Sequence, residues 1–455
     1  MLNRAELLQG WMSGMRRMMA SGCYADDFRS SYGPDVIFGG YVPGEVVALR
    51  GRDDVAQVLT RWHPSPAEIA HWSATEFADA VGEICGARLD VEWRFDGQLQ
   101  RHRRSHLVHL GDAGIYRHVV FSARPAADSL PAGEPGPALA ELYASARGRR
   151  AVGAGTSATP MQQITTDSGE TVFVKWFVPD QGWQGRLTAD TGREAMLWSQ
   201  GWLDQLPAGV SHPIIAAEPY GDGIWVTVSR DVTPNLVRGK RLALSQMRDY
   251  IAALDRMYGV FVGREPPDGL ATMEERWGIF WPAAVASEHD QPDGFIKGVA
   301  RGWDLLDEAV DDDVVDVVRA VVADPAAITG RLRPSFLHGD ACPANVAIEG
   351  STLVLFDWSL ATAGPPENEG AWLANFAQFY RFSTDELLEL WRSVRGPEHD
   401  ETAFGLSLLG QASGLIPALL TSVVDYPDPV HRAFSRMKLE WWMGIVRRYQ
   451  HLLSP

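Results

Sequence analysis

The amino-acid sequence predicts an α+β protein built from at least two domains. The chain has 455 residues, more than one compact domain of ordinary size holds. Residues 124–137 contain four prolines and show no hydrophobic periodicity, so they divide the chain into two parts. Helical patterns precede alternating, strand-like patterns in the first part, and strand-like segments precede a long helical region in the second.

Composition and charge narrow the classes of partner. The formal net charge of −17 disfavours nucleic acid as a partner, because such affinity comes largely from Lys and Arg neutralising phosphates, and it suits a cationic or neutral substrate. The cysteines Cys23, Cys85 and Cys342 are too widely spaced for a disulfide framework or a zinc site. We find no apolar run of about 18 residues and no signal peptide, so we expect a cytoplasmic protein without a membrane partner.

The pattern of residues 1–125 predicts two helices followed by strands. Apolar residues recur at helical spacing at Leu7, Trp11, Met15 and Met18. A second helix is predicted after Gly51, where Asp53 and Asp54 suit the helix dipole. Three strand-like runs follow, at residues 88–95, 99–110 and 115–123. Helices followed by a long antiparallel meander predict an α+β layer domain.

This first part resembles the nuclear-transport-factor-2-like, or SnoaL-like, family. The resemblance rests on the runs 24–28, 34–38 and 51–55 and on the long hairpins at the end of the segment. It implies a cone-shaped α+β domain with a pocket, and the members include isomerases, dehydratases, cyclases and modules that only bind or dimerise. Candidate acid–base residues are Asp27, His102, His106 and His118. We expect a non-catalytic role, with a homodimer through this domain; a buried His–Asp pair would favour an isomerase or cyclase instead.

The second part contains a constellation of polar residues suited to phosphoryl transfer. An apolar stretch ends at His338, Asp340 follows two residues later, and Asn345 lies five residues beyond it. A turn at residues 349–350 leads into an apolar strand that ends at Asp357. Such a hairpin brings two carboxylates and an amide oxygen together, and these are the hard oxygen ligands that Mg²⁺ takes. Protein kinases place a catalytic Asp, an Asn and a metal-binding Asp in the same order.

The segment His338-Gly339-Asp340 with Asn345 and the later Asp357 resembles the aminoglycoside phosphotransferase and choline kinase superfamily. The resemblance implies a bilobal protein-kinase-like fold, with Asp340 as catalytic base and with Asn345 and Asp357 holding Mg²⁺. Residues 363–365 continue the pattern, but Glu369 stands where the family more often has Asp, which suggests a capping or structural role for it.

A nucleotide-binding lobe is predicted upstream of this group of polar residues. Lys175 lies at the centre of a strand at residues 171–177, and Glu194 opens an amphipathic helix at the spacing expected of its ion-pair partner. A loose phosphate loop would use Gly153, Gly155 and Ser157, although Ala158 replaces the third glycine of the kinase pattern. The backbone near Ser229 and Arg230, after a strand at residues 224–230, should meet adenine.

The boundaries that follow are an N-terminal domain at residues 1–125, a linker at 126–138, and kinase-like lobes at 139–231 and 232–455. The sequence therefore predicts an ATP-dependent kinase, with GTP as the alternative donor, acting on the hydroxyl of a small molecule. The alternative is a nucleotide-binding regulator of the pseudokinase type that uses the N-terminal domain as ligand sensor. Aminoglycosides, other antibiotics, choline-like amines, sugars and nucleosides all stay open as acceptors.

Overall fold

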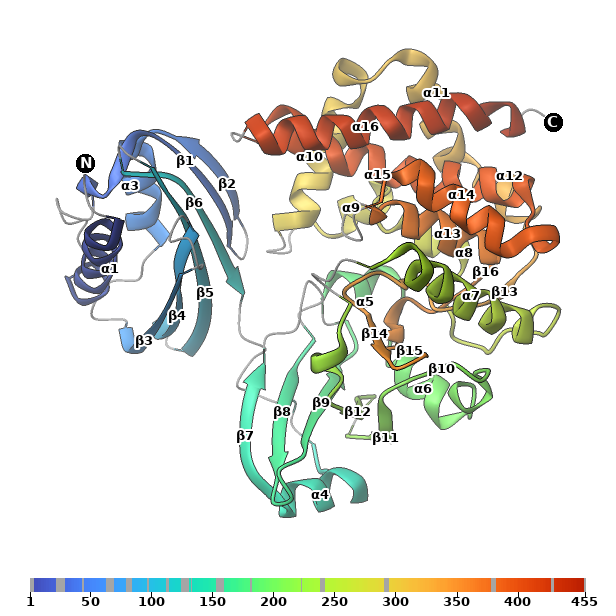
Figure 1. The fold of residues 1–455 in the computed structure, drawn as a ribbon, viewed down its shortest axis with the longest axis horizontal. Helices are drawn as coiled ribbons and strands as arrows, with labels where there is room; N and C mark the ends of the chain where they lie inside the picture. The colour runs from blue at the N-terminus through green and yellow to red at the C-terminus, as the bar shows by residue number, and fades with distance from the viewer. Residues whose placement is uncertain are drawn as a thin grey trace. The chain divides into compact units, whose positions relative to one another are not determined.

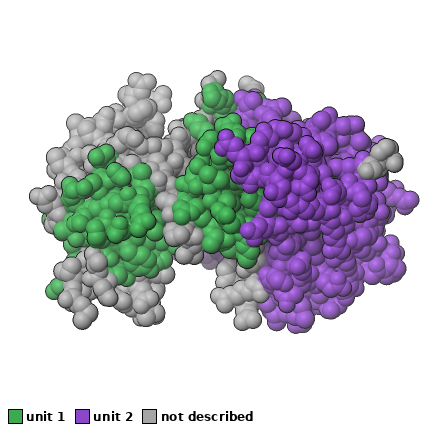
Figure 2. Space-filling view, turned by 90° about the horizontal axis from the view of Figure 1, so that it is seen from above, with its two compact units in different colours: residues 1–128, 287–305, 418–439 green, residues 129–286, 306–417, 440–455 purple. Residues whose placement is uncertain are grey.

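The computed structural model forms two compact units (Figure 2). Unit 1 comprises residues 1–128, 287–305 and 418–439, and unit 2 comprises residues 129–286, 306–417 and 440–455. The structure describes the chain except for residues 1–3, 22–28, 43–44, 63–68, 79–83, 96–97, 112–113, 124–130, 132, 153–158, 181, 222, 238–241, 290–293, 378–381, 427–428 and 454–455.

The N-terminal part of unit 1 is a six-stranded sheet with two helices (Figure 1). The helices are α1 (Arg4–Ser21) and α3 (Arg52–Trp62). The strands are β1 (Tyr32–Val42), β2 (Glu45–Arg50), β3 (Ile69–Ala78), β4 (Ile84–Phe95), β5 (Gln98–Gly111) and β6 (Gly114–Ala123). The sheet order is β2-β1-β6-β5-β4-β3, in which β1 and β6 pair in parallel and the other neighbours are antiparallel.

The two predicted helices and the three predicted strand runs are confirmed as α1, α3, β4, β5 and β6. Strands β1, β2 and β3 were not predicted as strands. Gly39 and Gly40 interrupt the pattern of β1, and short apolar runs such as β2 do not distinguish strand from helix by periodicity. The parallel pairing of β1 with β6 joins residues far apart in the chain, so no local sequence pattern predicts it.

The first lobe of unit 2 is a five-stranded antiparallel sheet in the order β11-β12-β9-β8-β7. Its strands are β7 (Ala146–Val152), β8 (Met161–Thr166), β9 (Thr171–Phe177), β11 (Ile214–Pro219) and β12 (Trp225–Arg230). Its helices are α4 (Pro137–Ala144), α5 (Trp183–Leu187) and α6 (Arg193–Ser199). Buried Val174, Trp176 and Val226 form its core with residues of the neighbouring strands.

Helix α4 begins inside residues 126–138, which the sequence predicted as a linker. Proline is tolerated in the first turn of a helix, where its missing N–H has no intrahelical partner, so Pro137 starts the helix instead of preventing it. The carboxylate of Glu218 on β11 accepts hydrogen bonds from the backbone N–H groups of Ala138 and Leu139, each at 3.0 Å. These bonds satisfy two N–H groups that the helix start leaves open.

The remainder of the chain is mostly helical, as expected. Its helices are α7 (Leu244–Phe261), α8 (Met273–Gly278), α9 (Pro282–Ser287), α10 (Gly294–Ala309), α11 (Asp312–Ala323), α12 (Ala326–Thr329), α13 (Pro366–Ala374), α14 (Thr384–Arg395), α15 (Glu401–Val424) and α16 (Pro429–Tyr449). Short strands lie between α12 and α13: β13 (Ser335–Leu337), β14 (Val346–Glu349), β15 (Thr352–Leu355) and β16 (Thr362–Gly364). β14 and β15 form the hairpin that was predicted around the turn at residues 349–350, with β10 (Val210–Ser211) beside β15.

Helix α15 is apolar over a membrane-spanning length, although no such span was expected from the sequence. Its 24 residues are long and apolar enough to cross a membrane by length and composition alone, with a mean hydropathy of 1.5 in the most apolar window. That window is 89% buried inside the protein, as in the core helix of a globular fold.

Candidate active site

Lys175, Glu194 and Asp357 meet in unit 2, although they come from three separate elements. Lys175 lies on β9, Glu194 in the first turn of α6, and Asp357 just after β15. The Lys175 Nζ atom lies 2.7 Å from Asp357 Oδ1 and 3.9 Å from Glu194 Oε2. Lys175 therefore faces Glu194, the partner expected from the sequence, and it also hydrogen-bonds Asp357, which the sequence did not pair with it.

Burial and charge act against each other in this cluster. Burial alone would lower the pKa of Lys175, but the carboxylates of Asp357 and Glu194 raise it above its ordinary value. Burial would raise the pKa of Asp357, yet the Lys175 ammonium and a hydrogen bond from Ser359 hold it below its usual range. For Glu194, burial dominates and raises the pKa despite the neighbouring lysine. The lysine and Asp357 thus form a charged pair in which the lysine side chain is 14% exposed and the aspartate side chain 35% exposed.

The backbone around Asp357 is held in an uncommon conformation. Asp357 has φ 62° and ψ 66°, in the left-handed region that a residue with a side chain rarely adopts. The next N–H, of Trp358, donates to Glu194 Oε2 at 3.0 Å, and Thr227 Oγ1 donates to the other oxygen of Glu194 at 3.0 Å. Glu194 therefore holds both the lysine and the backbone that follows Asp357.

Asp340 is oriented by two N–H donors. Trp372 Nε1 donates to Asp340 Oδ1 at 2.6 Å, and Asn345 Nδ2 donates to Asp340 Oδ2 at 2.8 Å. Burial raises the pKa of Asp340 to about 6, although the Arg276 guanidinium and the Trp372 hydrogen bond act to lower it. A carboxylate with a pKa close to the working pH is suited to accept a proton.

Gly339 lies at a tight crossing of the chain next to Asp340. Its φ is +79°, and a Cβ there would lie 1.7 Å from the carbonyl oxygen of Leu360. Its N–H donates to Glu369 Oε1, and its carbonyl accepts from Arg276 Nε at 2.9 Å. Glu369 is fully buried, which raises its pKa to about 7. Glu369, for which the sequence suggested a capping or structural role, therefore fixes the backbone before Asp340.

His338 joins the two halves of the constellation. Its Nδ1 accepts from the N–H of Asp340 at 3.2 Å, so its Nε2 is the protonated nitrogen and donates to the Phe356 carbonyl at 3.1 Å. Its ring centroid lies 4.4 Å from that of Trp358. Burial lowers the pKa of His338 to about 4, so the ring is neutral at neutral pH and acts as a structural bridge between the segments of Asp340 and Asp357.

Of the remaining residues predicted to bind the nucleotide, the structure describes only two. Ser229 and Arg230 end β12, and the Arg230 guanidinium contacts both oxygens of Glu349, at 2.6 and 2.7 Å. The side chain of Arg230 thus connects the strand that leaves the first lobe with the β14–β15 hairpin. Gly153, Gly155 and Ser157 lie outside the described residues.

The acid–base candidates of the N-terminal part are only partly described. Asp27 lies outside the described residues, and of His102 only the backbone, in β5, is described. His106 and His118 are fully buried, with His118 Nε2 3.0 Å from His106 Nδ1 and His118 Nδ1 2.6 Å from the Tyr32 hydroxyl. Burial lowers the pKa of His118 to about 3. The contact found is therefore a His–His–Tyr chain, where a His–Asp pair would have favoured acid–base chemistry.

Three residues of the site were missed from the sequence: Arg193, Arg276 and Trp372. Arg276 and Trp372 contact each other, with the guanidinium carbon 4.2 Å from the indole centroid, and both approach the Asp340 segment. Arg193 precedes Glu194 and is 4% exposed. The signal that could have found them was their position beside predicted elements: Arg193 next to Glu194, and Trp372 in the motif continuation after Glu369.

Comparison with known proteins gives one family match, to the phosphotransferase enzyme family over residues 248–404. No curated protein matches the chain. Similar solved structures include the three that follow. A thermostable mutant of the aminoglycoside phosphotransferase APH(4)-Ia, with ADP and hygromycin B, is 12% identical and covers 68% of this chain and 97% of its own, with a TM-score of 0.42.

The second is the choline kinase LicA from Streptococcus pneumoniae, which is 13% identical and covers 68% of this chain and 98% of its own, with a TM-score of 0.44. The third is a choline/ethanolamine kinase family protein from Mesorhizobium loti, which is 14% identical and covers 70% and 94%, with a TM-score of 0.39. The family match spans the segment that contains Asp340, Asn345 and Asp357. The phosphotransferase class expected from the sequence is confirmed by this family match.

Proposed function

We propose that the chain is an ATP-dependent small-molecule kinase that transfers the γ-phosphoryl group to a substrate hydroxyl, with GTP as the alternative donor. The observation that carries the proposal is the assembly of one site from two clusters in unit 2. Lys175 bonds Asp357 at 2.7 Å, and Asn345 bonds Asp340 at 2.8 Å, while His338 bridges the two segments. A regulator without catalysis has no need of a carboxylate that two N–H donors orient beside the predicted metal site.

Asp340 is proposed as the general base. Each carboxylate oxygen has two lone pairs, and the donors Trp372 and Asn345 use one on each, so the carboxylate retains capacity for the acceptor O–H. Asp340 takes the proton as the acceptor oxygen bonds to the γ-phosphorus. The bond from that phosphorus to the bridging oxygen breaks, and its electron pair leaves on the nucleoside diphosphate.

Asn345 and Asp357 are proposed to hold Mg²⁺. The fit rests on chemistry, because an amide oxygen and a carboxylate are hard oxygen donors, and Mg²⁺ takes few protein ligands beside nucleotide phosphates. The Lys175 ammonium lies 2.7 Å from Asp357 Oδ1, which supports the view that this carboxylate is arranged to meet a cation. When bound, the ion neutralises charge that develops on the transferring phosphoryl group.

Lys175 is proposed to pair the nucleotide phosphates while Glu194 holds it. Backbone groups at Ser229 and Arg230 would meet adenine, and the loop containing Gly153, Gly155 and Ser157 would cover the phosphates. Support for the first assignment is the position of Lys175 between two acids, whose negative charges outweigh the effect of burial and favour its charged form. Support for the second is the position of both residues at the end of β12, where the chain leaves the first lobe.

The test is Mg²⁺-dependent ATP turnover by the purified full chain against pools of aminoglycosides, amino alcohols, sugars and nucleosides. One pool should stimulate turnover, and the Asp340→Asn variant should reduce it by about 10² to 10⁴-fold while nucleotide affinity is retained. An amide at residue 340 keeps one oxygen that can still accept from Trp372 Nε1, so the variant tests proton acceptance more than folding. Normal turnover by the variant would show that Asp340 is not the base.

For the N-terminal part we propose a SnoaL-like module with a non-catalytic binding or homodimerisation role in a cytoplasmic protein. In support, His118 is hydrogen-bonded to Tyr32 and His106 and has a pKa lowered to about 3, so it is poorly suited to accept a proton at neutral pH. Light scattering of the full chain should report a dimer. A monomer at all concentrations would remove the dimerisation role.

A further inference from the structure

Arg193, the residue before Glu194, is a buried arginine bound by backbone carbonyls. Its Nε donates to Gly269 O at 2.8 Å, one Nη to Thr188 O at 2.7 Å, and the other Nη to Ser359 O. Its own N–H donates to Asp190 Oδ1 at 2.7 Å, which fixes the start of α6. These bonds connect α6 with the segment that follows Asp357 and with the chain before α8.

Two successive residues of α6, Arg193 and Glu194, therefore hold the two residues that follow Asp357. Glu194 accepts the N–H of Trp358 at 3.0 Å, and Arg193 donates to the carbonyl of Ser359. The Ser359 hydroxyl in turn donates to Asp357 Oδ1 at 2.8 Å. The contacts of Arg193 thus end one hydrogen bond away from the carboxylate proposed to hold Mg²⁺.

The left-handed backbone of Asp357 explains why the hydrogen bonds from α6 to this segment are needed. A non-glycine residue in the left-handed region is strained, so surrounding contacts must hold it there. A planar guanidinium reaches three carbonyls in fixed directions, whereas the ammonium of lysine is a single point that cannot span all three. Arginine is therefore required at residue 193 if all three segments are to be held together.

We propose that Arg193 is a positioning residue that locks the Asp357 segment to α6, so that Lys175, Glu194 and Asp357 are set as one unit for Mg²⁺–nucleotide binding. The inference rests on the proposed function. Arg193 contacts no reacting atom; it acts through Ser359 on Asp357. Loss of its contacts should weaken the part of nucleotide affinity that depends on Mg²⁺ and leave the metal-free part unchanged.

The experiment is calorimetric titration of the full chain with ADP, with and without Mg²⁺, for wild type and Arg193→Lys. We expect Mg²⁺-dependent ADP binding to weaken by about 10 to 100-fold in the variant, as for residues that orient metal ligands, with metal-free ADP binding unchanged. Equal affinities with Mg²⁺ for the two proteins would overturn the inference. Failure of the wild type to bind ADP under any condition would instead refute the proposed function.

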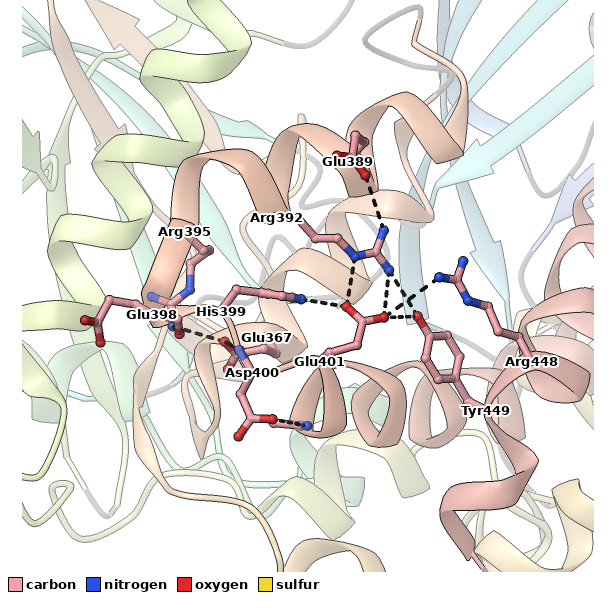
Figure 3. Close-up of polar contacts among 11 residues, drawn as sticks. Glu367, Glu389, Arg392, Arg395, Glu398, His399, Asp400, Glu401, Arg448 and Tyr449 are labelled. Atoms are coloured by element: carbon pink, nitrogen blue, oxygen red, sulfur yellow. Dashed lines mark hydrogen bonds and ion pairs between the residues drawn. The ribbon is translucent and has the colours of Figure 1, made fainter.

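The matched control is Arg392→Lys, which makes the same change in another arginine of unit 2. Arg392 of α14 binds both oxygens of Glu401, at 2.9 and 3.1 Å, within a cluster that includes Tyr449 and Arg448 (Figure 3). This variant should lower the unfolding temperature and leave the Mg²⁺ dependence of ADP binding unchanged. A loss of Mg²⁺-dependent binding in Arg392→Lys as large as in Arg193→Lys would show that general destabilisation is the cause.

A second measurement needs no variant and keeps the inference testable if Arg193→Lys does not fold. Hydrogen exchange of the wild type should show peptides from residues 193–199 and 357–361 gaining protection together when ADP and Mg²⁺ are added. Protection of one segment without the other would contradict the proposal that α6 and the Asp357 segment behave as one unit.

Discussion

At the scale of single residues, the site depends on polar groups whose hydrogen-bonding partners are themselves fixed. Asp340 is held by Trp372 and Asn345, and Asp357 by Lys175 and Ser359. Burial raises the pKa of Asp340, whereas the Lys175 ammonium outweighs burial and lowers the pKa of Asp357, so the two pKa values depart from the ordinary value in opposite directions. The consequences can be measured as pH dependence and as sensitivity to small substitutions.

The first prediction concerns the pH dependence of catalysis. Asp340 must be ionised to accept a proton, and burial raises its pKa to about 6. We therefore expect kcat/KM for the acceptor to fall about tenfold for each pH unit below about 6 and to be level just above it. The measurement is a pH–rate profile at saturating Mg²⁺ and ATP. A profile that stays level down to about pH 4.5 would exclude Asp340 as the group that titrates.

A second prediction concerns Gly339 and uses Gly350 as its control. Both have positive φ, +79° and +62°, but a Cβ on Gly339 would lie 1.7 Å from Leu360 O, whereas nothing lies within 4 Å of one on Gly350. Gly350→Ala should cost only the conformational strain, about 1–2 kcal/mol. Gly339→Ala should cost more than about 4 kcal/mol or prevent folding. Urea unfolding measures both, and equal losses would show that strain alone matters at Gly339.

At the scale of elements, two helices hold the segments that contain Asp340 and Asp357. Helix α6 supplies Arg193 and Glu194 to the Asp357 segment, and α13 supplies Glu369 and Trp372 to the Asp340 segment. Both helices present these residues to backbone groups or side chains of loops, so the loop geometry is set by the helices and not by the loops alone. The position of α13 is in turn linked to α14 and α7, because Arg395 binds both Glu367 and Asp255.

A third prediction tests how α13 holds the catalytic loop. The pKa of Glu369 is raised by burial from 4.5 to about 7, so the folded state binds its proton more tightly than the unfolded state. The stability that this carboxyl contributes is fully present below pH 4.5 and is lost as the pH rises through about 7. Glu369→Gln keeps an oxygen for the Gly339 N–H and cannot ionise. Relative to wild type, it should therefore become more stable by about 1–3 kcal/mol between about pH 4.5 and about pH 8.

Urea unfolding of both proteins at the two pH values provides the test of Glu369. Asp340 also titrates in this window, but it is present in both proteins and largely cancels in the difference. A stability difference that is the same at both pH values would mean that the pKa of Glu369 is the same in the folded and unfolded states.

At the scale of the whole molecule, every described residue assigned to phosphoryl transfer lies in unit 2. Unit 1 contains the six-stranded sheet together with residues 287–305 and 418–439. The second half of the chain therefore contributes to both compact units. Nucleotide binding should stabilise the unit that contains the site and have little direct effect on the other.

The fourth prediction follows from this division. Differential scanning calorimetry should show two transitions, and ADP with Mg²⁺ should raise the midpoint of only one. Ligand at about 100 times its Kd stabilises the bound unit by about 2.7 kcal/mol, which is a shift of several degrees. A single transition that moves as a whole would show that the two units unfold together.

The sequence by itself determined the enzyme class and the order of the chemical groups, because these are carried by short local patterns. The spacing of Asp340, Asn345 and Asp357 around one hairpin is evident in the amino-acid sequence, and so are the strand of Lys175 and the helix of Glu194. Periodicity also revealed α1, α3 and the strands β4 to β6.

Only the tertiary structure decided how these groups are held. Arg193 reaches Ser359 across 166 positions of the chain, and Trp372 reaches Asp340 across 32. The parallel pairing of β1 with β6 is of the same kind. Local periodicity reports which face of an element is buried, but it carries no information about which distant residue will lie against that face. A single hydrogen bond between distant residues depends on the packing of the whole unit, and for this reason the sequence pointed to the proposed catalytic groups but not to the residues that position them.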